Sequence, residues 1–146
     1  MALKGDFSFP KYKPEGMLRG VNSKAYNYIF WGVIFLFLAV AMGAFGAHRL
    51  EKILEAKALS TYKTGVTYQF YHGFGLILVG MLQLQLRTDL SKTAYLFFAG
   101  IILFCFNCYL YSITGVKALA MIVPFGGVAF LFGWGWLAIN IFKVRK

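Results

Sequence analysis

Charged residues are missing from four long stretches of this sequence, and acidic residues are scarce throughout. Five Asp and Glu stand against fifteen Lys and Arg, which gives a formal net charge of +10. The charges lie in the tails and turns around the apolar stretches, a pattern that membrane topology and anionic lipid headgroups explain better than nucleic acid does. Because the four stretches hold no Asp, Glu, Lys or Arg, we expect neither a proton relay nor an ion site inside the membrane.

Cysteine is also rare, with Cys105 and Cys108 as the two examples. A secreted disulfide scaffold carries more cysteines, and carries them outside apolar stretches. Tetrahedral zinc needs four ligands, and the chain offers no second Cys-x-x-Cys pair. A redox pair needs access to water. We therefore expect both cysteines to pack as small apolar residues.

An apolar core is missing from residues 1–24, which excludes a secretory signal peptide there. Asp6, Pro10, Pro14 and Glu15 also argue against a transit peptide. We predict a polar, basic tail without a stable helix, followed by a single transmembrane domain over residues 25–146. Because a free tail of this composition is disordered, we expect a partner to hold it.

Apolar residues make up 60% of the chain, well above the roughly 45–50% of an average soluble domain. About 20 residues span a hydrocarbon core of ~30 Å, and continuous rather than alternating apolar character favours helices over strands. The sequence therefore predicts an all-α, integral membrane four-helix bundle with helices over about 28–47, 66–86, 94–116 and 118–142.

The connections between these helices are short, except for the first. Between His48 and Gly65, the apolar residues Leu50, Ile53 and Leu54 share one helical face, which predicts a short amphipathic helix at the membrane surface. The second connection offers Asp89 or Ser91 as a cap for the third helix. The third connection turns at Gly115.

The distribution of Lys and Arg predicts the orientation of the bundle. Ten lie in the N-terminal tail, the second connection and the C-terminal tail, and five lie in the other two connections. By the positive-inside rule, both termini face the cytoplasm of a bacterium or the matrix of a mitochondrion. On this basic side, Lys24, Arg87, Lys92 and Lys143 are candidates for binding phospholipid headgroups.

Each apolar stretch carries a stripe of small or polar residues, as membrane helices need for close packing. The bulky residues then face lipid or a partner. The segment Pro124–Gly127 interrupts the fourth stretch, and without nearby charge we interpret it as a packing kink rather than a substrate site. The predicted packing residues are Gly32, Ala39, Gly43, Gly46, Gly73, Gly80, Asn107, Gly126 and Gly133.

Few polar side chains remain inside the four stretches. His48 and His72 fall near the same membrane face, so they are the candidates for a haem or metal site; hydrogen bonding at helix ends or to loop carbonyls is the interpretation we prefer. Gln83, Asn107 and Asn140 fit interhelical hydrogen bonds better than a solute path, although both stay open.

Three segments carry a resemblance to a known family. Gly43–Leu50, Tyr68–His72 and Pro124–Gly127, the last together with Gly133 and Trp134, resemble, in order and spacing, the domain-of-unknown-function 423 family. These are small four-helix membrane proteins of bacteria and mitochondria, whose animal member is called transmembrane protein 256. The resemblance covers about residues 28–142 and implies the fold, but no chemistry.

The chain departs from that family at two places. Arg49 stands where the family usually has Gly, and Cys105–Asn107 replaces a Ser-Gly-Ser segment. The second change puts any shared function of that helix face in doubt.

These observations together favour a non-catalytic accessory subunit of a larger membrane assembly, and a respiratory-chain complex of the mitochondrial inner membrane is the assembly we expect. Its partners would be other membrane subunits and phospholipids, cardiolipin among them, without a cofactor and without nucleic acid. A small-solute transporter or channel is the alternative. A haem- or quinone-binding redox subunit is the second alternative, and a bacterial plasma membrane is the alternative location.

Overall fold

The computed structural model describes residues 15–144; residues 1–14, which hold most of the predicted tail, and residues 145–146 lie outside the described part. All regular structure in the described part is helical. In chain order the elements are α1 (Glu15–His48), the 3-10 helix η1 (Leu50–Lys52), α2 (Ala56–Leu86), α3 (Ser91–Gly100), the π-helix η2 (Ile101–Phe106), α4 (Asn107–Thr114) and α5 (Lys117–Val144). Because α3, η2 and α4 follow one another without a break, they form one rod. The predicted all-α fold with four long helices is confirmed.

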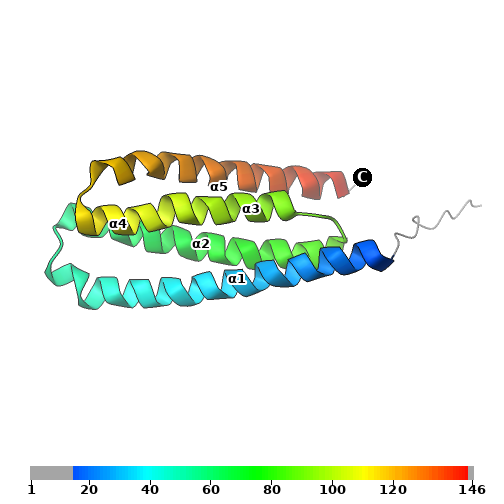
Figure 1. Cartoon of the computed structure of the whole chain (residues 1–146), viewed down its shortest axis with the longest axis horizontal. Helices are drawn as coiled ribbons and strands as arrows, with labels where there is room; N and C mark the ends of the chain where they lie inside the picture. The colour runs from blue at the N-terminus through cyan, green and yellow to red at the C-terminus, as the bar shows by residue number, and fades with distance from the viewer. Residues whose placement is uncertain (1–14, 145–146) are drawn as a thin grey trace, which may run out of the picture.

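The four rods lie side by side in chain order, with α1 at one edge and α5 at the other (Figure 1). α1 packs most extensively on α2, and α5 packs on the rod α3–η2–α4. The α2–α3 connection, the start of α1 and the end of α5 all lie at one end of the molecule, while η1 and the α4–α5 turn lie at the other (Figure 1). We call these the terminal end and the far end.

Two of the predicted helix boundaries are wrong. α1 begins at Glu15, inside the segment that we predicted to lack a stable helix. α2 begins at Ala56, well before the apolar stretch that starts at Val66. A helix closes its hydrogen bonds within its own backbone, so it continues past the apolar residues into polar sequence, and hydropathy marks only its apolar part. The expectation that a partner holds the tail concerns residues largely outside the described part.

The predicted amphipathic helix between the first two rods is not confirmed. The segment instead contains the single 3-10 turn of η1, and the extended backbone of Glu55 (φ −62°, ψ 153°) separates this turn from α2. Leu50 is nonetheless buried, while Ile53 is exposed. The turn therefore anchors the connection through one apolar side chain rather than through a helical face.

The α4–α5 turn is built as predicted. Gly115 adopts a left-handed conformation (φ 69°), and its N–H donates to the Tyr111 carbonyl across 2.8 Å. A residue without Cβ adopts this conformation at no steric cost. The turn reverses the chain within two residues, which lays α5 back along the rod α3–η2–α4.

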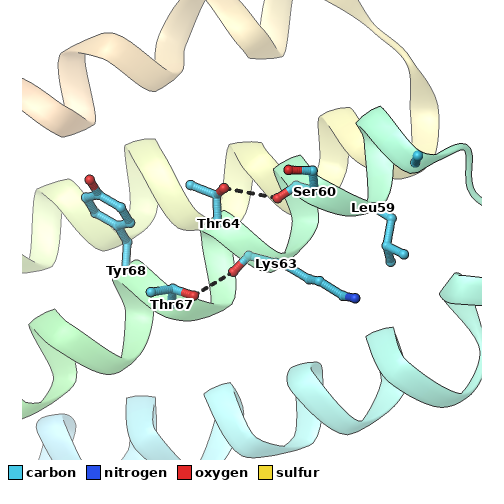
Figure 2. Close-up of a pocket in the computed structure, with 7 residues that line it drawn as sticks. Leu59, Ser60, Lys63, Thr64, Thr67 and Tyr68 are labelled. Carbon is cyan, nitrogen blue, oxygen red and sulfur yellow. Dashed lines mark hydrogen bonds between the residues drawn. The ribbon is translucent and has the colours of Figure 1, made fainter.

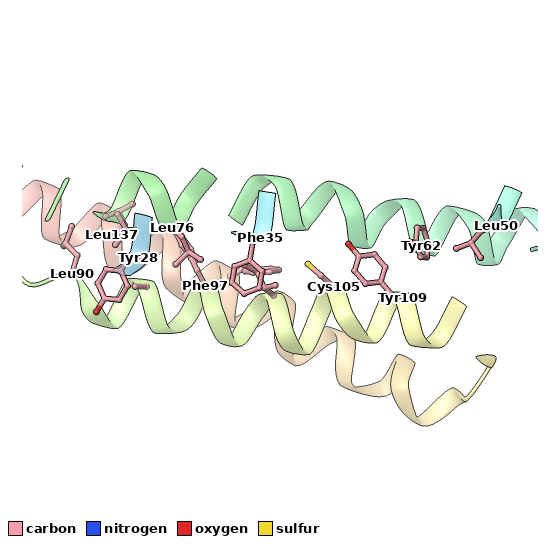
Figure 3. Packing of buried hydrophobic residues seen from close by; sticks show 14 residues of the cluster. Tyr28, Phe35, Leu50, Tyr62, Leu76, Leu90, Phe97, Cys105, Tyr109 and Leu137 are labelled. Carbon is pink, nitrogen blue, oxygen red and sulfur yellow. The ribbon is translucent and has the colours of Figure 1, made fainter. Parts of the chain in front are cut away.

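Buried apolar side chains form one continuous cluster along the bundle axis (Figure 3). It runs from Tyr28 and Leu90 at the terminal end, through Phe97, to Tyr62 and Leu50 at the far end. The cluster lies between the rods, so each rod buries one stripe and leaves the opposite side exposed.

Small residues allow α1 and α2 to approach closely. A Cβ at Gly32 would lie 2.8 Å from the Gly73 carbonyl oxygen, and one at Gly80 would lie 2.7 Å from the Ala25 carbonyl oxygen. Real Cβ atoms do not come this near to backbone atoms, so the contact requires glycine. The other predicted packing residues of α1 lie on the same stripe, where Ala39 is fully buried and Gly43 and Gly46 face the side chains of Val66 and Tyr62.

Three helical segments of the described chain are long and apolar enough to cross a membrane: Asn22–Lys52, Ser91–Thr114 and Lys117–Val144. Helix α2 is equally long but less apolar. Its polar side chains Gln69, His72 and Gln83 are buried between the rods, whereas Lys57, Lys63 and Gln85, nearer its two ends, are exposed.

Candidate functional site

His72 lies at the middle of α2 and is held by two hydrogen bonds. Its Nδ1 lies 2.8 Å from the Tyr68 carbonyl oxygen, and its Nε2 lies 3.2 Å from the indole Nε1 of Trp134 on α5. A carbonyl oxygen only accepts and an indole N–H only donates. The imidazole is therefore neutral, with its proton on Nδ1.

Aromatic rings enclose the His72 imidazole. Phe130 of α5 stacks on it with ring centroids 3.3 Å apart and an interplanar angle of 10°. Tyr68 lies one turn earlier on α2, at 22° to the imidazole, and stacks on Phe104 of η2 at 27°. Tyr68, His72 and Phe130 thus lie within 31° of one another, whereas Phe104 is tilted by 56° from Phe130.

A groove of about 600 Å³ opens beside these rings, between α2 on one side and α5 with η2 on the other. We call it the α2–α5 groove. Its walls are mostly apolar and aromatic, with Val128 and Leu131 at its exposed rim. Its size falls within the ~300–1,000 Å³ typical of small-molecule sites. The lining residues are Tyr68, Tyr71, His72, Phe104, Pro124, Gly127, Val128, Phe130, Leu131 and Trp134.

The π-helix and a glycine of α5 set the width of the groove. A Cβ at Gly126 would overlap the backbone nitrogen of Phe104, so α5 and η2 touch through their backbones. The extra residue per turn of a π-helix frees carbonyl groups, and the Asn107 side-chain amide donates to the carbonyls of Leu103 and Ile102 across 3.0 and 3.3 Å. Asn107 therefore stabilises its own helix. The prediction that Asn107 makes a hydrogen bond between two helices is therefore wrong.

The structure does not bring His48 and His72 together. His48 is exposed at the end of α1, whereas the α1 neighbour of Gly73, next to His72, is Leu36. Leu36 and His48 are twelve residues apart on α1, which is about 18 Å along the helix axis at 1.5 Å per residue. The two histidines do not form a bis-histidine haem site. His72 also has both ring nitrogens engaged.

The other polar residues that the sequence singled out also bond locally. Gln83 is fully buried, and its Oε1 accepts the Leu90 N–H across 2.8 Å at the start of α3. Asn140 donates to the Trp136 carbonyl of its own helix across 2.7 Å. Cys105 and Cys108 are free thiols buried against α2 and its neighbours. These residues fill the bundle and do not line a shared polar path.

Gln69 is an interhelical link to which we assigned no bonding partner from the sequence. Its Nε2 donates to the Phe35 carbonyl of α1 across 2.9 Å, and its Oε1 accepts the Tyr109 hydroxyl of α4 across 2.8 Å. A single buried amide thus ties three rods together. Its place beside small residues on α2 was the available signal.

Tyr68 and Tyr71, which belong to one of the segments that resemble the family, both line the α2–α5 groove. Their spacing of four and one residues before His72 was the signal that they share its region of α2. Neither hydroxyl makes a hydrogen bond to another described residue. Tyr68 also lines a second hollow of about 400 Å³ on α2, where Lys63, Thr64 and Thr67 lead towards the far end (Figure 2).

The predicted headgroup-binding residues gather at the terminal end. Lys24 of α1 lies 4.0 Å from the Asp89 carboxylate, and the Lys92 ammonium lies 5.0 Å from the centre of the Trp136 ring. Lys143, near the end of α5, and Arg87, just after α2, are exposed at the same end. Asp89 also accepts the Ser91 N–H across 2.8 Å just before α3, but the N-cap position of α3 is Leu90, not the predicted Asp89 or Ser91. Hydrogen bonds from Ser91, and the nearby Lys24, hold the pKa of the Asp89 carboxyl below its usual value.

Comparison with known proteins finds similar membrane proteins in bacteria. The model of a family described as "protein of unknown function (DUF423)" matches residues 42–127. A UPF0382 membrane protein of Staphylococcus saprophyticus is 38% identical over 117 residues, covering 80% of this chain and 98% of the relative. The UPF0382 membrane protein YwdK of Bacillus subtilis is 40% identical over 118 residues, covering 80% of this chain and 96% of the relative. No solved structure matches the chain.

Proposed function

The chain belongs to the DUF423 family, and from this premise we propose that it crosses the membrane four times and serves as a non-catalytic subunit of a larger membrane assembly. The observation that carries the proposal is the outer face of α5. Phe125, Phe132 and Ile139, spaced by seven residues, form one exposed stripe there, with the two phenylalanine side chains 69% and 66% exposed. The stripe points away from the helices that α5 covers, so it is available to a neighbouring membrane protein.

Four membrane crossings are supported by the way α2 packs. Helix α2 runs alongside the other rods over its whole length (Figure 1), and its polar side chains are bonded within the bundle. In a bilayer a buried polar group needs an internal partner, and the buried Gln69, Gln83 and His72 of α2 each have one. We propose that both termini face the cytoplasm or the matrix, in line with the excess of Lys and Arg on that side.

The relatives are bacterial membrane proteins, which fits a bacterial plasma membrane. The mitochondrial inner membrane and a respiratory-chain complex stay our proposal for the assembly. Lys24, Arg87, Lys92 and Lys143 at the terminal end would contact phospholipid headgroups, cardiolipin among them. We propose no catalytic role, and no cofactor for this subunit role.

The bundle core gives less support to a transporter or channel. Gln83 is fully buried with its amide oxygen bonded, and Asn107 and Asn140 bond to carbonyls of their own helices. A solute path needs polar groups that face one another across a wet cavity, and these three do not.

Native purification tests the subunit role. The full chain, tagged at its C-terminus, is extracted from its own membrane in a mild detergent, and its assembly size is measured on a native gel. We expect a complex much larger than the chain, and we expect Phe125→Ala with Phe132→Ala to release the chain from it. Phe37→Ala, which removes an equally exposed ring from α1, is the matched control and should leave the complex intact. Migration of the unaltered chain as a monomer or small homo-oligomer would contradict the proposal.

A further inference from the structure

The Tyr71 hydroxyl lies near the middle of the proposed membrane span of α2, where an unpaired polar group is most costly. Tyr71 is the middle residue of α2, about 22 Å along the helix from either end at 1.5 Å per residue, whereas the hydrocarbon half-thickness is ~15 Å. Its side chain is 60% exposed, and its hydroxyl makes no hydrogen bond to a described residue. The bilayer at this depth offers no acceptor, so an unpaired hydroxyl is unfavourable there.

Tyr68 repeats this situation one turn earlier. Its ring stacks on Phe104 with centroids 4.6 Å apart and lies 6.0 Å from the His72 imidazole, and its hydroxyl also lacks a hydrogen-bond partner among the described residues. The two phenols line the same α2–α5 groove. The groove therefore presents two hydrogen-bond donors beside an aromatic wall.

The shape of the groove matches a flat molecule. The rings of Tyr68, His72 and Phe130 lie within 31° of one another, and Phe104 lies 27° from Tyr68, so a planar ring entering the groove can pack against this aromatic wall. The exposed rim at Val128 and Leu131 opens to the side of the bundle. A ligand would thus enter from the lipid phase.

We propose that the α2–α5 groove binds a lipid-soluble molecule with a flat, carbonyl-bearing ring, of the quinone class. The ring would stack against Tyr68 and Phe104, and its carbonyl oxygens would accept hydrogen bonds from the Tyr68 and Tyr71 hydroxyls. The proposal needs no electron transfer. It rests on the membrane span proposed for α2, and it does not depend on the assembly of the chain with other subunits.

His72 is a positioning residue for this site. Both its ring nitrogens are occupied, one by the Tyr68 carbonyl and one by the Trp134 indole, so it has no free atom for the ligand. Its role is to hold the Trp134 and Phe130 rings of α5 at the groove.

Tryptophan fluorescence of the purified full chain in lipid nanodiscs tests the proposal. The chain has three Trp, and Trp31→Phe with Trp136→Phe leaves Trp134, which lines the groove, as the single reporter. Decylubiquinone is the probe. Decylbenzene, which lacks carbonyl oxygens, is the control ligand, and its binding is measured by its ability to displace decylubiquinone. We expect saturable quenching by decylubiquinone and at least tenfold weaker binding of decylbenzene.

Variants of the same reporter chain separate recognition from simple partition into lipid. Tyr68→Phe with Tyr71→Phe keeps both rings and removes both hydroxyls, and should weaken quinone binding by about tenfold, since each neutral hydrogen bond contributes about 0.5–1.5 kcal/mol. Val128→Phe should block the groove, and Val40→Phe, an equally exposed position of α1, should not. Thermal unfolding checks that each variant folds.

Three results would each overturn the proposal. The first is quenching that rises linearly with decylubiquinone concentration and does not saturate. The second is a quinone affinity that neither the double Tyr→Phe variant nor Val128→Phe changes. The third is an affinity for decylbenzene equal to that for decylubiquinone. The last result would leave an unselective apolar hollow. None of these results bears on the native-gel test of the subunit role.

Discussion

The indole N–H of Trp134 donates a hydrogen bond to Nε2 of His72 across 3.2 Å and so joins α5 to α2 at mid-depth of the bundle. Helices α2 and α5 otherwise touch little, because each packs mainly on other rods. The bond fixes the tautomer of the imidazole and keeps the α2–α5 groove at its present width. We therefore expect conservative substitutions of Trp134 or His72 to affect the stability of the bundle.

Trp134→Phe should lower the stability of the bundle by about 1–3 kcal/mol, the cost of leaving a buried acceptor unpaired. Combining it with His72→Phe removes both partners, and we expect the double variant to recover part of the loss. Denaturant unfolding in detergent micelles measures both effects. Additive losses in the double variant would show that the bond contributes nothing of its own.

Tyr109→Phe should destabilise the chain by about 0.6 kcal/mol, the average for interhelical hydrogen bonds in membranes, and by no more than about 1.7 kcal/mol, the maximum. The variant leaves Gln69 Oε1 without its donor at a site that is almost fully buried. Tyr111→Phe removes a hydroxyl from the same helix where no described residue accepts it, and is the matched control. Equal unfolding free energies for the two variants would refute the role assigned to Gln69.

Gly126→Ala should separate α5 from η2, because the new Cβ would meet the backbone of Phe104. Backbone cannot move aside cheaply, so we expect a loss of about 1–3 kcal/mol, as for other overpacked sites. Gly127→Ala places its Cβ at an ordinary 3.8 Å from the Phe104 ring, and should be neutral or slightly stabilising. Thermal unfolding of the two neighbouring variants makes the comparison, and a Gly126→Ala variant as stable as Gly127→Ala would contradict the backbone contact.

Acid should weaken the start of α3. Because folding lowers the pKa of Asp89, its contribution is complete above the ordinary carboxyl pKa of about 4 and is lost as the pH falls through the lower pKa of the folded state. Asp89→Asn keeps an acceptor for the Ser91 N–H and removes the titration. The thermal midpoint should therefore fall less steeply with acid in Asp89→Asn than in the unaltered chain, and identical pH profiles would rule out this contribution.

Labelling of single added cysteines tests the four membrane crossings. Cys105 and Cys108 are buried, so a membrane-impermeant maleimide should leave them largely unmodified. Lys143→Cys at the terminal end should react from one side of a sealed vesicle, and Lys52→Cys at the far end from the other. Reaction of both positions from the same side would exclude the proposed topology.

Much of the fold follows from local sequence. The missing charges identify four helical rods, and Gly115 marks a turn that the structure confirms. The boundaries at Glu15 and Ala56 were not predictable from hydropathy, because a backbone hydrogen-bond ladder does not stop where apolar residues do. The π-helix was also missed, since it depends on how Asn107 and α5 meet the backbone of η2.

The candidate site was the least predictable part. Sequence spacing suggested that His48 and His72 lie near one membrane face, but the early start of α2 moves His72 to the middle of its helix. Tyr68 and Tyr71 gain their importance only from what lies opposite them on η2 and α5. A polar side chain in an apolar stretch shows that a partner is needed, without showing which one.

The sequence by itself determined that this chain is an all-α membrane protein of the DUF423 family, because solvent preference and family motifs are properties of the residues alone. The tertiary structure decided which polar groups are paired. It gives Gln69, Gln83 and His72 partners on other elements and leaves the hydroxyls of Tyr68 and Tyr71 without one among the described residues. Pairing depends on distances between helices far apart in sequence, and those distances are set by where glycine lets two backbones touch.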